Sequence, residues 1–200
     1  MARRIFVLRH GETRFNSERK LQGHCNSPLT EKGVMQAQNY GLGLRDYLSV
    51  GDIEVHSSPL GRAVQTARLV CEELGYPAQL IVEDDRLKEF YLGDWEQRMI
   101  PSLVQEQPDL LEQNDWYLQA PNSETYEAVK CRLQSWLADT SADKDIVVIS
   151  HGLTGIVLRG LLLGLDYEGV WQQDLPQDAF FIIKNNNVQR VNCAESSLAV

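Results

Sequence analysis

Short apolar runs alternate along this chain with segments in which apolar residues recur every three or four positions. The runs cover residues 5–8, 53–56, 80–82 and 146–149, and the first and last contain no polar residue. Uninterrupted apolar runs are typical of strands that are buried on both faces. Their alternation with helical segments predicts an α/β fold, namely a three-layer α/β/α sandwich with a mainly parallel sheet.

Capping residues mark where the predicted helices begin and end. Thr30 is expected to cap the first long helix. Ser58 and Pro59 predict a second helix, with the serine as N-cap and the proline at the first helical position, and Gly75 ends it. Apolar positions from Tyr126 onward predict a third helix, and residues 153–163 a fourth.

Two segments depart from this alternation. Residues 89–120 are irregular and rich in aromatic side chains, which predicts a crossover or cap with short helices. Residues 179–183 and 188–191 flank an asparagine-rich turn and predict a β-hairpin. Because no repeat or linker interrupts the chain, we expect a single domain over residues 1–200 with the cap at about 89–120.

Composition and charge narrow the possible partners. Hydrophobic residues make up 43% and charged residues 24%, which is typical of a globular protein. A net charge of −9 argues against a general nucleic-acid or membrane binder. The apolar run after Met1-Ala2-Arg3-Arg4 is too short for a signal peptide or membrane span, so we expect a cytoplasmic protein. Four scattered cysteines without a CxxC pair favour reduced thiols.

Cationic and imidazole side chains follow three of the predicted strands. Arg9-His10-Gly11 follows the first strand, Ser150-His151-Gly152 follows the strand at 146–149, and Arg62 lies in the first turn of the helix after the second strand. Since the carboxyl ends of parallel strands meet at one edge, these side chains should lie together. With the amides of nearby helix N-termini, they predict a site for a compact anion such as phosphate.

The same residues suggest a reaction as well as a binding site. Two neighbouring guanidinium groups disfavour an imidazolium, so His10 should be neutral and able to accept a phosphoryl group that water later removes. Arg9, Arg62 and His151 would stabilise the charge that develops on the phosphoryl oxygens. Glu89 follows the third strand and is the best-placed general acid for the leaving alkoxide.

Leu8-Arg9-His10-Gly11-Glu12-Thr13 resembles the signature of the histidine phosphatase superfamily, whose fold is shared by cofactor-dependent phosphoglycerate mutases. Further motifs follow in the family's order: Asn16, Gln22-Gly23, residues 27–33, residues 57–63, Glu89 with Gly93-Asp94-Trp95-Glu96, and Ser150-His151-Gly152. The resemblance implies His10 as phosphoacceptor and Glu89 as proton donor. It implies that the phosphoryl group is held by Arg9, Arg62, His151, Asn16, Gln22, Gly23 and Gly152. It implies no metal and no cofactor.

Within this family the chain is similar to the short phosphatase branch, which includes broad-specificity and α-ribazole-phosphate phosphatases. It departs from the family pattern at Phe15, where many members have tryptophan, and at residues 121–125, which replace a Gly-Glu-Ser arrangement. The expected function is hydrolysis of a small phosphorylated metabolite. Two alternatives stay open: mutase-type phosphotransfer and a non-catalytic module that binds a phosphorylated ligand. A homodimer also stays open.

Other polar and aromatic residues are assigned by their context. His56 is interpreted as an ordinary polar position, and the four histidines lack the spacing of a metal site. Several residues could either wall the substrate pocket or simply pack in the cap or on the surface: Lys20, His24, Trp95, Arg98, Trp116 and Tyr117.

Overall fold

One six-stranded sheet, in the order β3-β2-β4-β1-β5-β6, forms the centre of the molecule. The computed structural model describes residues 3–193. The strands are β1 Ile5–Arg9, β2 Ile53–Ser57, β3 Val82–Glu83, β4 Asp145–Ser150, β5 Ala179–Lys184 and β6 Asn187–Asn192. The α-helices are α1 Arg14–Ser17, α2 Glu31–Leu44, α3 Gly61–Leu74, α4 Ile100–Glu106, α5 Tyr126–Asp139, α6 Gly152–Leu163 and α7 Tyr167–Trp171.

The sheet is mixed. β4 runs parallel to both β1 and β2, and β3 is parallel to β2. The C-terminal hairpin of β5 and β6, which the sequence predicted, joins β1 in the antiparallel direction. The parallel arrangement that the alternation predicted therefore holds for β3, β2, β4 and β1, and the hairpin makes the sheet as a whole mixed. Its parallel part still brings Arg9, Ser57 and Ser150 to one edge, because Arg9 pairs with Ser150 and Ser57 with Ile149.

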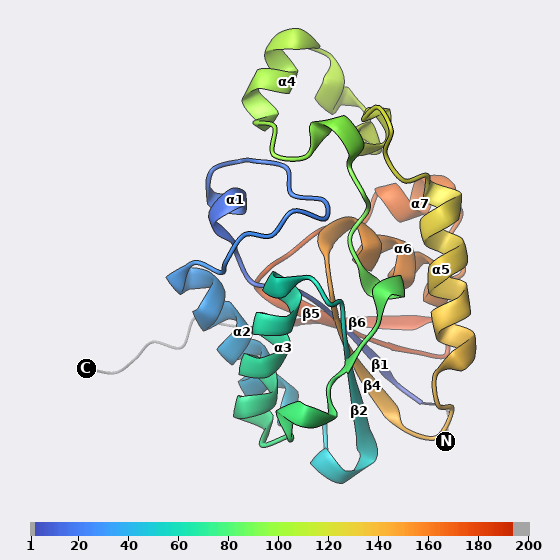
Figure 1. Cartoon of the computed structure of the whole chain (residues 1–200). Coiled ribbons are helices and arrows are strands. Elements are labelled where there is room, and N and C mark those ends of the chain that lie inside the picture. The colour runs from blue at the N-terminus through green and yellow to red at the C-terminus, as the bar shows by residue number, and fades with distance from the viewer. Residues whose placement is uncertain (1–2, 194–200) are drawn as a thin grey trace.

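Helices cover both faces of this sheet, α2 and α3 on one side and α5, α6 and α7 on the other (Figure 1). Ile5 and Val7 of β1 belong to the hydrophobic cluster that includes α5 and α6. Phe6 and Leu8, which alternate with them, belong to the cluster of α2 and α3. Burial on both faces explains why the run at residues 5–8 has no polar position.

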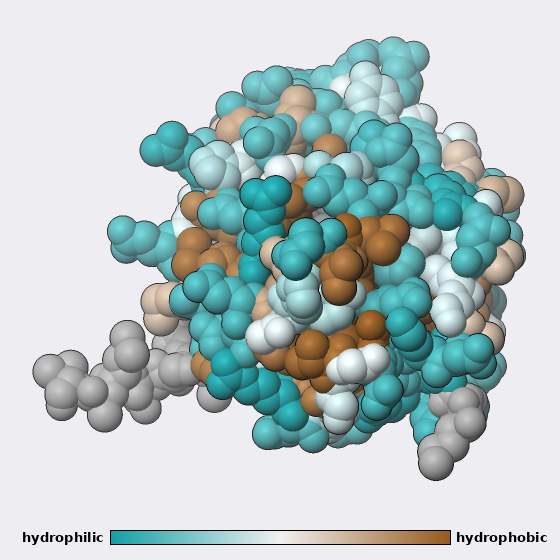
Figure 2. Space-filling view, turned by 60° about the horizontal axis from the view of Figure 1, so that its bottom comes forward, coloured by the Kyte–Doolittle hydropathy of each residue, from teal (hydrophilic) through white to brown (hydrophobic). Residues whose placement is uncertain are grey.

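After β3 the chain forms the 3-10 helix Asp85–Leu87 beside α5 and then a lobe above the strand ends, drawn in green in Figure 1. The lobe contains α4 and three short 3-10 helices, Gly93–Trp95, Leu110–Glu112 and Trp116–Gln119. Hydrophilic residues cover most of the face seen in Figure 2, with hydrophobic residues in small groups between them. Among residues 3–193, no helix combines the length and apolar character needed to cross a bilayer.

Two predicted element boundaries were wrong. The third strand is only Val82–Glu83, because Leu80 ends a 3-10 helix, Ala78–Leu80, that follows Pro77, and Ile81 is the C-cap of that helix. Helix α3 begins at Gly61 with Leu60 as its N-cap, so Ser58 does not cap it. The Ser58 hydroxyl instead contacts His151, as described below.

Two glycines fix the loop that follows β1. A side chain on Gly11 would place its Cβ 2.2 Å from the carbonyl oxygen of Gly33, and one on Gly33 would lie 2.0 Å from the carbonyl oxygen of Glu12. The loop can therefore lie directly on the first turn of α2. Thr30 caps that turn, as predicted, and its hydroxyl also contacts the Glu12 carboxylate at 3.0 Å. The chain next to His10 is held in place by these contacts.

Candidate active site

The residues predicted from the strand ends and motifs come together around one cavity of about 190 Å³. Its lining includes the predicted Arg9, His10, Asn16, Gln22, Gly23, Arg62, Glu89 and Gly152. His151 lies beside it, with its ring centroid 5.2 Å from that of His10 and the rings at 62°. The parallel register of β1, β2 and β4 is what brings these distant segments together.

The hydrogen bonds of His10 define a neutral imidazole. Its Nδ1 donates to the carbonyl oxygen of Gly11 at 2.7 Å, and its Nε2 accepts from Nε of Arg62 at 3.2 Å. Burial of the ring, then the charges of Arg62 and Arg9, hold the pKa of His10 well below its usual value. The lone pair of His10 is therefore on Nε2.

The two arginines differ in how fully the protein engages them. Arg62 donates from Nη1 to the carbonyl of Cys25 at 2.8 Å and from Nη2 to that of Gly23 at 2.7 Å. Burial lowers the pKa of Arg62 to about 10, which leaves it charged at neutral pH. Arg9 donates from Nη1 to the carbonyl of Leu175 at 2.6 Å, and its buried Nε has no partner among the described residues. That N–H can serve an anion in the cavity.

Asn16 has a fixed amide orientation. Its Oδ1 accepts from the backbone N–H of Thr13 and from Nε2 of Gln177, both at 3.1 Å. The Thr13 hydroxyl caps α1 by accepting from the backbone N–H of Asn16. With its oxygen occupied, the Asn16 side chain has its Nδ2 donor left for the cavity.

His151 stands at the N-cap of α6, and burial holds its pKa well below the usual value, with a further contribution from Arg62. Its Nε2 lies 2.7 Å from the hydroxyl oxygen of Ser58. Its buried Nδ1 has no hydrogen-bond partner in the part of the chain that is described. Sequence reasoning assigned Ser58 to a helix cap and so missed this contact.

The first amides of α6 donate to a carboxyl group that is a side chain of the protein itself. Oε1 of Glu89 accepts from the backbone N–H groups of Thr154 at 2.9 Å and Phe90 at 3.0 Å, and contacts the Thr154 hydroxyl at 3.1 Å. Oε2 accepts from the N–H of Leu153 at 3.2 Å. We expected free helix amides to hold phosphate; at α6 these two amides hold the Glu89 carboxylate instead.

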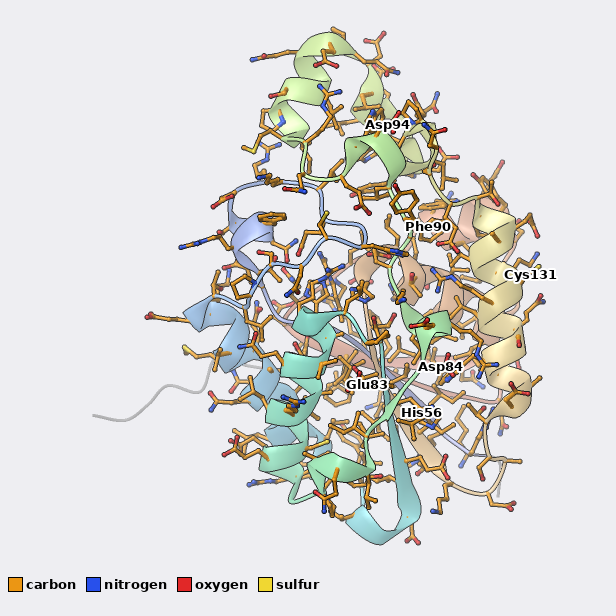
Figure 3. The ribbon with its side chains drawn as sticks, in the orientation of Figure 1. His56, Glu83, Asp84, Phe90, Asp94 and Cys131 are labelled. Atoms are coloured by element: carbon orange, nitrogen blue, oxygen red, sulfur yellow. The ribbon has the colours of Figure 1, made fainter. Side chains whose placement is uncertain are left out.

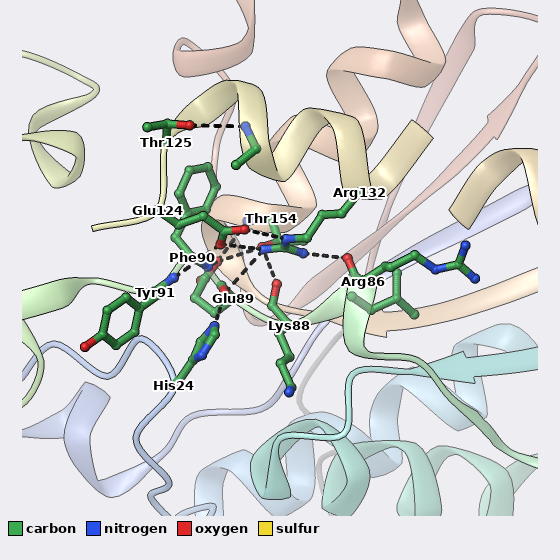
Figure 4. Close-up of polar contacts among 12 residues, drawn as sticks. His24, Arg86, Lys88, Glu89, Phe90, Tyr91, Glu124, Thr125, Arg132 and Thr154 are labelled. Atoms are coloured by element: carbon green, nitrogen blue, oxygen red, sulfur yellow. Dashed lines mark hydrogen bonds and ion pairs between the residues drawn. The ribbon is translucent and has the colours of Figure 1, made fainter. Parts of the chain in front are cut away.

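The backbone of Glu89 is also held from two sides (Figure 4). Its carbonyl oxygen accepts from Nε2 of His24 at 2.8 Å and from Nη2 of Arg132 at 3.3 Å. Arg132 forms an ion pair with Glu124, the residue that stands in the unusual segment 121–125. None of residues 121–125 lines the cavity. Their position points to support of Glu89 and not to contact with substrate.

The proposed pocket walls divide into two groups. Tyr117 and Lys20 line the cavity, together with several residues that sequence reasoning did not single out: Arg19, Leu21, Leu92, Ile100, Leu153 and Leu175. Trp116 is buried and stacks on Tyr117 at 3.8 Å, so it packs in the cap. Trp95 is likewise buried, and Arg98 pairs with Glu106. Apolar cap residues carry no sequence signal that separates pocket lining from packing.

His56 lies away from this cavity, at β2 and near Asp84 (Figure 3). It is buried, and its Nδ1 accepts from Nε1 of Trp136 at 3.2 Å. Burial lowers the pKa of His56. All four cysteines are free thiols. Within the described residues, no cluster of three histidine, cysteine or carboxylate side chains is arranged to hold a metal ion.

Comparison with known proteins identifies the family of the chain. The model of the histidine phosphatase superfamily (branch 1) matches residues 5–191. This chain belongs to the histidine phosphatase superfamily. It is a phosphatase acting on phosphate monoesters.

This histidine phosphatase is similar in sequence to two curated relatives and in structure to a solved α-ribazole phosphatase. The adenosylcobalamin/α-ribazole phosphatase of Escherichia coli K12 is 34% identical over 189 residues, which cover 92% of this chain and 90% of that protein. A protein named probable phosphoglycerate mutase GpmB, from Enterobacter sp. strain 638, is 33% identical over 80% of this chain and 75% of its own. The α-ribazole phosphatase of Shigella flexneri superimposes with a TM-score of 0.76 at 30% identity, covering 96% of each chain.

Proposed function

We propose that this histidine phosphatase hydrolyses small phosphate monoesters through a phosphohistidine on His10, with Glu89 as proton donor. The observation that carries the proposal is the state of His10: a neutral ring whose Nε2 lone pair borders a cavity shared with Glu89, Arg9 and Arg62. A nucleophile, an acid and fixed positive charge around one small cavity are the requirements of phosphoryl transfer.

In the first step, Nε2 of His10 attacks phosphorus and the ester P–O bond breaks. Glu89 gives its proton to the leaving oxygen. Oε2 is the oxygen suited to carry that proton, since it accepts from one amide while Oε1 has three polar neighbours. The N–H of Arg62 that binds Nε2 in the free protein then turns to a phosphoryl oxygen.

In the second step, water attacks the phosphohistidine. The Glu89 carboxylate takes a proton from the water, the P–N bond breaks, and inorganic phosphate leaves with His10 regenerated. In both steps the charge on the phosphoryl oxygens is met by donors that lack a partner in the described structure, Nε of Arg9 and Nδ1 of His151, together with Nδ2 of Asn16. Gln22, Gly23 and Gly152 complete the lining on this side.

The leaving group faces the cap. Leu92, Ile100 and Tyr117 come from residues 89–120 and line the cavity opposite the strand ends. We propose this segment as the part of the single domain that selects the substrate. The Tyr117 ring offers a surface for a flat leaving group, and the names of the relatives make α-ribazole phosphate the first substrate to test.

The test is a phosphate-release assay on chelator-treated protein. The panel contains α-ribazole phosphate, 3-phosphoglycerate, sugar phosphates, nucleotides and p-nitrophenyl phosphate. With labelled substrate and an alkaline quench, label should appear on His10 during turnover, because a P–N bond survives base, and His10→Ala should show neither label nor turnover. Transfer to a second hydroxyl without phosphate release would instead indicate a mutase, and binding without either reaction would indicate a non-catalytic module.

A further inference from the structure

We propose that Arg132 is a positioning residue for the proton donor: it holds the backbone on both sides of Lys88 so that the Glu89 carboxyl faces the leaving group. The proposal rests on the proposed function, since it takes Glu89 as the donor. Arg132 itself does not line the cavity. Its hydrogen bonds reach the cavity through Glu89, and its charge also contributes to the lowered pKa of His151.

Glu89 needs such support because of where it lies in the chain. It follows the 3-10 helix Asp85–Leu87 and precedes the 3-10 helix Gly93–Trp95, in a stretch without helix or strand. Its neighbours therefore have no ladder of backbone hydrogen bonds to fix them. A catalytic group on irregular backbone keeps its position only if other parts of the protein hold that backbone.

Arg132 supplies this support from α5 (Figure 4). Its Nη1 donates to the carbonyl oxygen of Arg86, and its Nη2 donates to that of Glu89 at 3.3 Å. One planar guanidinium thus spans two carbonyls that are three residues apart. By contrast, each of the other two side chains contacts a single carbonyl of this stretch. His24 donates to the carbonyl of Glu89, and the Thr154 hydroxyl donates to that of Lys88 at 2.7 Å.

Glu124 fixes the orientation of the guanidinium. Its Oε1 accepts from Nε of Arg132 at 2.9 Å and its Oε2 from Nη2 at 3.1 Å, a bidentate pair. The backbone N–H of Glu124 also donates to the carbonyl of Tyr91 at 2.8 Å. The Arg132–Glu124 pair therefore ties residues on both sides of Glu89 to the start of α5. Both side chains are largely buried, at 16% and 21% exposed, which limits competition from water.

Loss of this pair should be measured on the first step, the transfer of the phosphoryl group to His10, because only there does Glu89 protonate the leaving group. A catalytic group displaced by about 1 Å can lose roughly 100-fold in rate. Protonation by a general acid contributes about 10²- to 10⁴-fold, and it contributes most when the leaving group is a poor one. A displaced Glu89 should therefore slow alkyl phosphates and leave p-nitrophenyl phosphate nearly unaffected. A general loss of folding or of phosphate binding would slow both classes equally.

The experiment measures single-turnover phosphoryl transfer to the enzyme over a series of esters whose leaving groups differ in pKa. For Arg132→Gln we expect a loss of about 10- to 100-fold with alkyl phosphates and less than about threefold with p-nitrophenyl phosphate. Arg132→Lys keeps the charge but cannot span both carbonyls, so it should resemble the glutamine variant. In Arg132→Gln the Glu124 carboxylate loses its partner. The double variant Arg132→Gln, Glu124→Gln removes that unpaired carboxylate, and it replaces the single variant in the experiment if the single variant folds poorly.

Arg86→Gln is the matched control. The Arg86 side chain ties the same segment to the same helix, through Asp84 and Asp139, without touching Glu89. It should leave the leaving-group dependence unchanged. If Arg132→Gln matches this control, or slows all esters equally, the proposal is overturned.

A double-mutant cycle with Glu89→Gln separates this proposal from the proposed function. If Arg132 acts through Glu89, then Arg132→Gln should change the rate with alkyl phosphates by less than about threefold once Glu89 is replaced. Full additivity would overturn the positioning role. If Glu89→Gln itself slows all esters equally, Glu89 is not the proton donor and the proposed function fails at that point instead.

Discussion

The Ser58 hydroxyl oxygen lies 2.7 Å from Nε2 of His151, and both residues are buried. The same oxygen already accepts from the backbone N–H of Leu60 at 3.3 Å. Among residues 3–193, Nε2 of His151 is the acceptor that contacts the serine hydroxyl, so we assign the serine as donor and Nε2 as acceptor. The imidazole proton of His151 is then on Nδ1, the nitrogen without a partner among residues 3–193. In the proposed function, Ser58 thereby prepares His151 as a donor to a phosphoryl oxygen.

Ser58→Ala should remove this control of the His151 tautomer. In the wild type, ¹⁵N NMR of the histidine side chains should show His151 with its proton on Nδ1, and the alanine variant should show a mixture. Loss of one such hydrogen bond should reduce kcat by about tenfold. Ser57→Ala is the control, because the Ser57 hydroxyl donates to the carbonyl of Ser58 and does not contact His151. Detection of the proton on Nε2 in the wild type would contradict the assignment.

Arg62→Lys should be severe although it conserves charge. Lysine cannot reach the carbonyls of Gly23 and Cys25 and Nε2 of His10 at once, as the guanidinium does. We expect kcat to fall about 100-fold or more, the usual effect of removing a donor to the developing charge. Vanadate should also bind more weakly. Arg68→Lys, an exposed change on the same helix, should leave both quantities unchanged.

The stability of the protein should fall as the pH drops below about 6.5. The pKa values of His56, His10 and His151 are all lowered in the folded protein, chiefly by burial. Below pH 6.5 these histidines bind protons in the unfolded chain but stay neutral in the folded protein. Their contribution to the unfolding free energy is therefore complete above pH 6.5 and is lost as the pH falls. Each can contribute a slope of at most about 1.4 kcal/mol per pH unit.

His56→Asn isolates one of these contributions without touching the active site. The asparagine oxygen can replace Nδ1 as the acceptor for Trp136 but does not titrate. In urea titrations between pH 8 and pH 5, the variant should lose less unfolding free energy than the wild type. Two curves that stay parallel over this range would show that His56 does not contribute.

Gly11→Ala should destabilise the fold by about 1–3 kcal/mol, the typical cost of forcing an extra group into packed structure. Its Cβ would meet the backbone of Gly33, which cannot rotate away as a flexible side chain could. Thermal unfolding measures the effect. Gly51→Ala is the matched control, because a Cβ there meets nothing within 4 Å. A Gly11→Ala protein as stable as this control would contradict the close packing of the loop on α2.

The cluster of Arg9, His10, Arg62 and His151 could be predicted from the sequence because one rule places it. Each lies at the end of a buried strand or shortly after it, and parallel pairing brings those strand ends to one edge. This reasoning survives the errors in the third strand and in the start of α3, since neither changes the register of β1, β2 and β4.

The supporting residues could not be predicted, because their partners are far away in the chain. Ser58 contacts a residue 93 positions later, and a serine before proline gives the local pattern of a helix cap. Arg132 contacts Glu89 across 43 positions. Arg132 lies on α5, and the periodicity of that helix identifies its apolar face. The periodicity does not indicate which polar residue of the helix contacts a distant loop. The antiparallel edge of the sheet depends on where the C-terminal hairpin docks, which its own pattern does not specify.

The lobe that closes the cavity comes from one continuous stretch of chain, whereas the phosphoryl contacts come from the ends of β1, β2 and β4 and from the loops that follow them. In the proposed function, the residues that break the bond and the segment that selects the substrate therefore lie in different parts of the chain. Replacement of the stretch from Gly93 to Gln119 could give the enzyme a new substrate and would leave His10, Glu89 and the residues around the phosphoryl group unchanged. This segment could be exchanged as a unit in protein engineering, and it could diverge in the same way after gene duplication.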